Sequence, residues 1–138
     1  MAERLLKHAL QAEPGFEHVN VYSAGISAYS GDGASENAVK ALEKVGLDLS
    51  DHRSRRLSPE LLEISDMILA MTHVHRDLIK EFYPESTVPV LLFREPAEGK
   101  NAEVPDPFGE NLNCYLETRD SLAEAIPALV AYIKQNLS

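Results

Sequence analysis

Asp66-Met-Ile-Leu-Ala-Met-Thr72 is the clearest structural signal in the sequence. Its apolar run from Met67 to Met71 has the length of a short strand that is buried on both faces. Thr72 is a residue type favoured at helix N-termini, and apolar side chains then recur at helical spacing as far as Phe82. The stretch predicts a buried strand followed directly by a helix, which is the repeating unit of a parallel sheet covered by helices.

The chain before this stretch predicts one strand between helices. Residues 3–12 carry apolar side chains at helical spacing, and residues 18–23 alternate Val19 and Val21 with polar neighbours, as a half-buried strand does. Further helices are predicted after Ser35, ending at Gly46, and after Ser58.

The chain after the stretch continues the alternation. Residues 88–93 form a third strand-like run, with Pro89 near its start. A last helix is predicted from about Asn113, and Pro127 should kink or divide it. Strands that alternate with helices in this way predict an α/β fold with a parallel sheet.

Length and composition predict one domain over residues 1–138. The chain has 138 residues, of which 44% are hydrophobic and 25% charged, and its net charge is −9. A negative field repels phosphate backbones and acidic lipid surfaces, so we expect neither nucleic acid nor membrane as a partner. The single cysteine, Cys114, excludes an internal disulfide, and we expect a cytoplasmic protein.

One acidic residue stands out as a candidate for catalysis. Asp106 lies between two prolines in Glu103-Val-Pro-Asp-Pro-Phe-Gly109, and these prolines stiffen the backbone on both sides of its carboxylate. A general acid needs such a fixed position, although Asp-Pro pairs are also common in ordinary turns. In the loop after Ser23, Tyr29 stands among small residues, either at the rim of a pocket or packed on its own loop.

Six stretches, taken in order, resemble the low-molecular-weight protein tyrosine phosphatases and their bacterial protein arginine phosphatase relatives. The stretches are Ser23-Ala-Gly-Ile-Ser-Ala-Tyr29, Asn37-Ala-Val-Lys-Ala-Leu42, Gly46-Leu-Asp-Leu-Ser-Asp-His-Arg-Ser-Arg55, Asp66-Met-Ile-Leu-Ala-Met-Thr-His73, Val104-Pro-Asp-Pro-Phe-Gly109 and Glu117-Thr-Arg-Asp-Ser-Leu122. The resemblance runs along the whole chain. It implies a three-layer α/β/α fold of the phosphotyrosine phosphatase I type.

The resemblance also implies a phosphate loop of pattern C-x5-R-[ST] between the family's first strand and first helix. The cysteine thiolate of that loop attacks phosphorus, and its backbone N–H groups and arginine bind the phosphate oxygens. The present sequence begins with Met1-Ala-Glu3, which matches the first turn of the helix after the loop. We therefore expect the central first strand and the nucleophile to be missing, a sheet of three strands instead of four, and an inactive chain.

A sheet without its central strand should be marginally stable alone. Two arrangements could compensate. The strand near Val19 could pair directly with the strand near Ile68, or a second copy of the chain could cover the gap as a homodimer.

The resemblance carries five residues of this sequence into functional roles. Asp106 matches the general acid that protonates the leaving group, and Tyr29 and Phe108 match aromatic residues on the walls of the substrate slot. Ser23 and His52 match residues that brace the phosphate loop by hydrogen bonds. His52 could instead be a surface histidine in the basic stretch that contains Arg53, Arg55 and Arg56. We interpret these three arginines as a solvated face.

Neither the cysteine nor the histidines supply a replacement site. Cys114 has no glycine-rich loop before it and no arginine six residues after it, where Asp120 stands, so we interpret it as a structural thiol. His73 and His75 are two residues apart, which does not bring them together on a helix face, and we interpret both as solvated. We expect no metal and no cofactor.

Three functions remain open. The parent protein could hydrolyse phosphorylated protein side chains, phosphotyrosine or phosphoarginine, with this sequence starting at an internal methionine. The chain could instead be a non-catalytic binding or regulatory relative that keeps the rim of the pocket. An arsenate reductase of the same fold would need further thiols, which one cysteine does not provide.

Overall fold

A computed structural model of the protein describes residues 1–26, 33–100 and 102–137. Its helices and strands follow one another as α1 (Ala2–Gln11), α2 (Glu36–Glu43), α3 (Pro59–Glu63), β1 (Ile68–Ala70), α4 (His73–Phe82), β2 (Val90–Leu92), α5 (Glu95–Glu98) and α6 (Leu112–Asn136). None of these helices has the length and hydropathy needed to cross a membrane.

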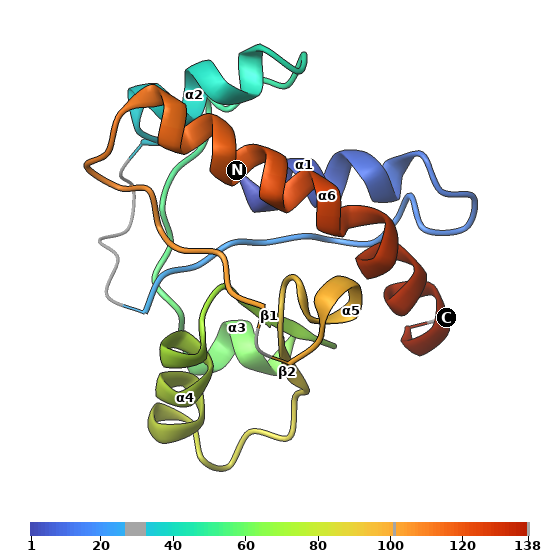
Figure 1. Ribbon diagram of the computed structural model, residues 1–138. Helices are drawn as coiled ribbons and strands as arrows, with labels where there is room; N and C mark the ends of the chain where they lie inside the picture. The colour runs from blue at the N-terminus through green and yellow to red at the C-terminus, as the bar shows by residue number, and fades with distance from the viewer. Residues whose placement is uncertain (27–32, 101, 138) are drawn as a thin grey trace.

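The sheet is parallel and lies between helices. β1 pairs with β2 so that Ile68 stands opposite Val90 and Ala70 opposite Leu92. α4 connects the two strands and packs on both, with α3 on the same side, whereas α1, α2 and α6 form the other layer (Figure 1). The α/β class and the parallel sheet predicted from the sequence are confirmed.

The strand predicted over residues 18–23 is not formed. Val19 and Val21 pack against the core as expected, but the sheet in the described part of the chain contains β1 and β2 only. An extended segment becomes a strand only when a neighbour completes its ladder of hydrogen bonds. Among the described residues the sheet thus has two strands and not the expected three, and the first of the two compensating arrangements, direct pairing of this segment with β1, is not formed.

The local signals for helix ends are confirmed. The hydroxyl oxygens of Ser35, Ser58 and Thr72 accept hydrogen bonds from the N–H groups of residues three positions later, at 3.2–3.3 Å. Gly46, just after α2, has φ of +79°, a backbone conformation that favours glycine.

Two features of the C-terminal region bear on the predictions, one of which is that Pro127 kinks or divides the last helix. Pro127 lies inside α6, which is one continuous helix and is not divided. A proline removes the hydrogen bond of its own nitrogen and crowds the carbonyl one turn earlier, but packing of the surrounding apolar residues retains the helix. The short helix α5 was not predicted; buried Arg94, just before it, donates to Glu98 within it and to the hydroxyl oxygen of Ser121 in α6.

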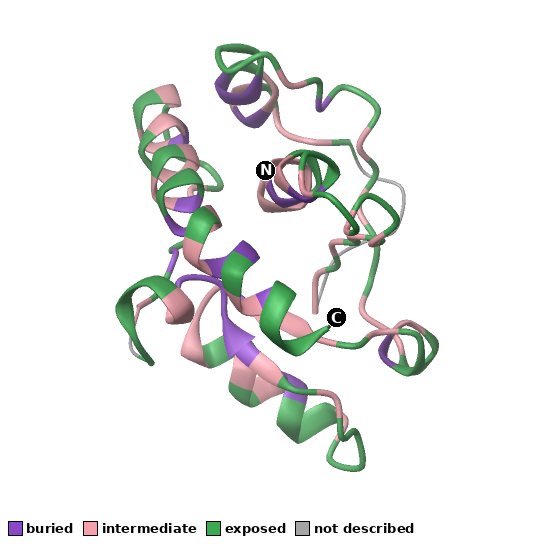
Figure 2. Ribbon diagram, turned by 90° about the vertical axis from the view of Figure 1, so that its right-hand side faces the viewer, coloured by how far each residue is buried: buried purple, intermediate pink, exposed green. Residues whose placement is uncertain are grey.

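Two apolar clusters form the core. The larger joins α1, the end of β2 and α6, and its buried residues are Leu6, Leu10, Phe93, Val104, Leu122, Ala125, Leu129, Val130 and Ile133. The smaller joins α2 to the start of α6 and contains Ala38, Ala41, Leu42, Leu49 and Tyr115. Figure 2 shows buried residues on β2 and on patches of the helices, with exposed residues on the outer faces. α6 is the element whose fully buried residues belong to both clusters.

Candidate active site

The loop of residues 103–109, which we call the Asp106 loop, starts at the carboxyl end of β1. The N–H of Val104 donates to the carbonyl oxygen of Met71 at 2.9 Å, and the Val104 side chain is buried in the larger core cluster. Active sites of parallel sheets lie at this edge. The loop that carries the candidate acid is thus fixed to the correct end of the sheet.

The Asp106 carboxylate is exposed and held in a local turn. Its Oδ1 atom accepts a hydrogen bond from the N–H of Phe108 at 3.0 Å, which is the geometry of an aspartate turn. The side chain of Phe108 is 79% exposed, so it contributes little to the core. Both side chains are accessible to a ligand.

The expected aromatic on the opposite wall, Tyr29, lies outside the described residues. The chain before it is placed by Gly25, whose N–H donates to the carbonyl of Arg55 at 2.8 Å and whose carbonyl accepts from the N–H of Leu57 at 3.0 Å. This bridge fixes the segment after Ser23 beside the basic stretch.

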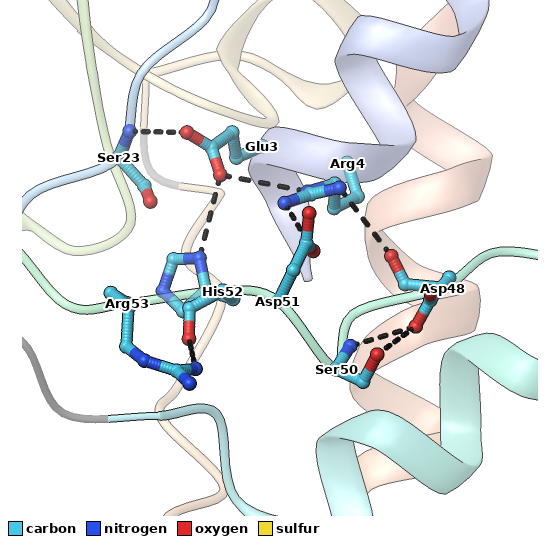
Figure 3. A network of polar contacts seen from close by, with 8 residues as sticks. All are labelled: Glu3, Arg4, Ser23, Asp48, Ser50, Asp51, His52 and Arg53. Carbon is cyan, nitrogen blue, oxygen red and sulfur yellow. Dashed lines mark hydrogen bonds and ion pairs between the residues drawn. The ribbon is translucent and has the colours of Figure 1, made fainter.

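Glu3 brings together the two residues that the resemblance assigned to bracing. Its Oε1 accepts a hydrogen bond from the N–H of Ser23 at 3.1 Å, and its Oε2 lies 3.5 Å from Nδ1 of His52 (Figure 3). The Glu3 side chain is 18% exposed, which strengthens these contacts relative to a surface pair. Ser23 and His52 are therefore joined through a carboxylate in the first turn of α1, and His52 is not a free surface histidine.

A second set of polar contacts extends this network. The guanidinium of Arg4 pairs with the carboxylate of Asp51 at 2.8 Å (Figure 3). The carboxylate of Asp48 accepts from the hydroxyl and the N–H of Ser50, at 2.6 and 2.8 Å. These hydrogen bonds, the hydroxyl first, hold the pKa of Asp48 below its usual value. The segment after α2 is thereby fixed against α1.

A polar cavity of about 220 Å³ opens among these residues. It is lined by Glu3, Arg4, Ser23, Asp51, His52, Arg53 and Arg55. Arg53 donates to the carbonyl of His52 at 2.7 Å, and Arg55 lies over the ring of Tyr22, 5.1 Å from its centroid. The side chains of Arg53, Arg55 and Arg56 are exposed, as the interpretation of a solvated basic face requires.

A contact that the sequence did not reveal holds the N-terminal end of the Asp106 loop. One carboxylate oxygen of Glu103 accepts hydrogen bonds from the N–H of His73, at 2.6 Å, and from its ring Nδ1, at 2.8 Å. The other ring nitrogen lies 2.8 Å from the carbonyl oxygen of Lys100. The interpretation of His73 as a solvated histidine is wrong, because both of its ring nitrogens have protein partners.

Cys114 lies in the first turn of α6 and is half-buried. Its N–H donates to the side-chain oxygen of Asn111 at 3.1 Å, and its carbonyl accepts from the hydroxyl of Thr118 at 2.9 Å. These contacts belong to the cap and the first turns of the helix. In the described parts of the chain, no three histidine, cysteine or acidic side chains gather as a metal site would require.

Comparison with known proteins gives a consistent result along the whole chain. The family model of low molecular weight phosphotyrosine protein phosphatases matches residues 1–138. A protein-arginine-phosphatase of Bacillus subtilis is 37% identical over 136 residues, which cover 99% of this chain and 89% of that protein. A probable low molecular weight protein-tyrosine-phosphatase, EpsP, of Ralstonia nicotianae is 31% identical over 134 residues, covering 97% and 86%.

The fold also resembles that of solved structures. The crystal structure of a YwlE mutant from Bacillus subtilis superposes with a TM-score of 0.88 at 37% identity, covering 96% of this chain and 88% of that one.

Proposed function

Because the chain belongs to the low molecular weight phosphotyrosine protein phosphatase family, we propose that its parent activity is the hydrolysis of phosphorylated protein side chains. A cysteine thiolate attacks phosphorus and forms a cysteinyl-phosphate, while the bond to the leaving group breaks. Asp106 donates a proton to the leaving atom, and water then releases inorganic phosphate from the cysteine.

The placement of Asp106 is the observation that carries this proposal. The Asp106 loop is bonded to the end of β1 through Val104 and Met71, and the carboxylate is exposed. A general acid must be within hydrogen-bonding reach of the group that it protonates, so it needs both a fixed backbone and access to substrate. Asp106 satisfies both requirements.

Five further residues receive roles under the same proposal. Phe108 and Tyr29 would flank the phosphorylated side chain. Ser23 and His52 would brace the phosphate loop, and their common partner Glu3 would hold them in position. Small displacements of catalytic groups have large effects on rate, so the half-buried carboxylate of Glu3 would contribute to catalysis by holding Ser23 and His52 in place.

We further propose that the 138-residue chain by itself is inactive. Its one thiol, Cys114, takes part in the first turns of α6, and the sequence around it has neither a phosphate-binding loop nor an arginine at the required spacing. Without a thiolate positioned to attack phosphorus, no leaving group departs, and Asp106 has no atom to protonate.

The substrate would be phosphoarginine or phosphotyrosine. The greater identity to a protein-arginine-phosphatase than to a probable protein-tyrosine-phosphatase, 37% against 31%, favours phosphoarginine. The net charge of −9 argues against nucleic acid and anionic membranes as partners. We also propose a cytoplasmic location, where a protein with a single cysteine would keep it reduced.

The test compares two proteins on phosphotyrosine and phosphoarginine peptides. One is the 138-residue chain, which should release no phosphate. The other is this chain preceded by a strand and a loop of the pattern C-x5-R-[ST] that the family resemblance implies, which should be active. In that protein Asp106→Asn should reduce kcat by about 10²- to 10⁴-fold.

Matched variants make the test specific. Glu110→Gln alters an exposed acid just outside the same loop and should leave kcat unchanged. Phosphate release by the 138-residue chain that survives Cys114→Ser and is lost in Asp106→Asn would contradict the proposal. An extended protein that is active but insensitive to Asp106→Asn would contradict the role of Asp106 alone.

A non-catalytic binding module is the second candidate. The exposed Phe108 and the arginine-lined cavity would remain available to a phosphorylated ligand without turnover. Calorimetric binding of a phosphopeptide to the 138-residue chain, weakened by Arg53→Gln or Arg55→Gln, would support this function. Absence of binding at millimolar peptide would exclude it.

A further inference from the structure

We propose that His73 and Glu103 are positioning residues for the Asp106 loop, and that their contact is complete only when the His73 ring carries two protons. This inference rests on the proposed function for the role of Asp106, but the contact itself can be measured without catalysis. His73, Glu103 and Lys100 together are called the loop clamp below.

The need for two protons follows from the partners of the ring. Nδ1 faces a carboxylate oxygen of Glu103 and Nε2 faces the carbonyl oxygen of Lys100, both at 2.8 Å. Both oxygens only accept hydrogen bonds, and a neutral imidazole has a single N–H. A neutral ring can therefore form only one of these two hydrogen bonds. Its other nitrogen would then present a lone pair to an oxygen.

Of the charged groups around the ring, the carboxylate of Glu103 favours the second proton, whereas the nearby cation of Arg76 does not. Glu103 lies against the ring, and Arg76, one turn further along α4, also acts on Glu103. Arg76 in turn lies 3.9 Å from Asp77. The hydrogen bonds from His73, that of its N–H first, hold the pKa of Glu103 below its usual value. Lys100 contributes a main-chain carbonyl, which accepts at any pH.

The backbone transmits the state of the loop clamp to Asp106. Glu103 precedes Val104, which is bonded to Met71, and Pro105 and Pro107 restrict the backbone on both sides of Asp106. A stiff segment moves as a unit when one end is released. Loss of the hydrogen bond between His73 and either Glu103 or Lys100 should therefore loosen the whole Asp106 loop and not only its first residue.

The expected pH dependence has two limits. At the basic limit, loss of the second ring proton removes one of the two ring hydrogen bonds of the loop clamp. As pH falls through the depressed pKa of Glu103, the carboxylate becomes protonated and accepts less strongly. The loop is held most firmly between these limits.

The test is amide hydrogen exchange with NMR on the 138-residue chain between pH 5 and 8. We expect the protection factors of the Val104 and Phe108 amides, which are corrected for the intrinsic rate, to fall by about two- to fivefold as the His73 ring deprotonates, the range for one partly exposed charged pair. His73→Gln and Glu103→Gln should each remove this pH dependence. His75→Gln, at an exposed neighbour, should keep it.

Two results would overturn the inference. One is an amide protection factor of Val104 or Phe108 that does not change as the His73 ring deprotonates in the unmodified chain. This measurement does not depend on the folding of any variant. The other is an unchanged pH dependence in folded His73→Gln. Asp106→Asn should keep the coupling at Val104, so failure of the proposed acid chemistry and failure of the loop clamp give different outcomes.

Discussion

The N–H of Val104 donates to the carbonyl oxygen of Met71 at 2.9 Å, while the Val104 side chain is 4% exposed. One residue thus joins the Asp106 loop to the sheet through its backbone and to the core through its side chain. The position of the candidate acid depends on the same packing that stabilises the domain.

We predict that Val104→Ala lowers the free energy of unfolding by about 2 kcal/mol, because it deletes two buried carbons and leaves a cavity. Urea unfolding measures the change. The matched control is Val74→Ala in α4, where the side chain is 64% exposed and the change should be within about 0.5 kcal/mol. Equal effects of the two substitutions would contradict the burial of Val104.

Glu3→Gln should destabilise the chain by about 1 kcal/mol, since it removes the charge that holds Ser23 and His52. Thermal unfolding of this variant can be compared with Glu36→Gln, which alters an exposed partner of Lys40 and should cost less than about 0.5 kcal/mol. In a His52→Ala background, most of the Glu3→Gln effect should disappear. Full additivity of the two substitutions would argue against their contact.

The stability contributed by Asp48 should depend on pH. Because its pKa is lower in the folded chain than in the unfolded chain, the contribution is fully present above the unfolded value, about 3.9, and is lost as pH falls through the folded value. Ser50→Ala removes the main cause, so it should raise the pKa of Asp48 and reduce stability at pH 7 but not in strong acid. Carboxyl NMR and urea unfolding at two pH values measure these effects.

Ser86→Ala is the control for that experiment. Its hydroxyl accepts a hydrogen bond from the N–H of Val88, with no carboxylate involved, so its effect on stability should not vary with pH. A pH-independent effect of Ser50→Ala would contradict the predicted linkage.

Phe108→Ala should change stability by less than about 0.5 kcal/mol, because the side chain is 79% exposed. In a form that carries the nucleophile, the same substitution should raise KM for a phosphopeptide, as the loss of an aromatic contact of about 0.5–1.5 kcal/mol, or two- to twelvefold, implies. Phe82→Ala, at the exposed end of α4, should leave KM unchanged. A large loss of stability in Phe108→Ala would place this ring in the core instead.

We predict that the 138-residue chain self-associates. β1 pairs with β2 on one side, and the extended segment at Val19–Val21 has no strand neighbour in the described part of the chain. Open edges of this kind tend to pair between molecules. Sedimentation velocity should show a dimer at micromolar concentration, weakened by Tyr22→Lys but not by Ile64→Lys just after α3. A compact monomer at all concentrations would contradict this prediction.

Helix ends were predictable because their causes are local. Ser35, Ser58 and Thr72 each lie three residues from the N–H group that they accept from, so the sequence shows both partners together. The failed strand at residues 18–23 has a different origin. Its alternation correctly indicated burial of Val19 and Val21, but pairing depends on a neighbouring strand, which no local pattern reports.

In the candidate site, too, local features were predictable and contacts between distant residues were not. Proline spacing identified the stiff turn at Asp106, whereas the loop clamp joins residues 30 positions apart and has no sequence signature. Glu3 was missed as the partner of Ser23 and His52, because an acidic residue in a first helical turn is common for reasons of helix charge alone. Only the fold shows which distant group such a carboxylate meets.

The packing of α1 against α6 has a consequence for synthesis of the chain. Leu6 and Leu10 of α1 share one core cluster with Leu129 and Ile133, more than a hundred positions later. The apolar face of α1 therefore stays exposed until α6 has been synthesised and has left the ribosome. Until then chaperones, proteases and other chains can bind it. Truncation before Leu129 would remove much of the α6 surface that covers α1, so nascent chains that end there should be degraded and should not accumulate.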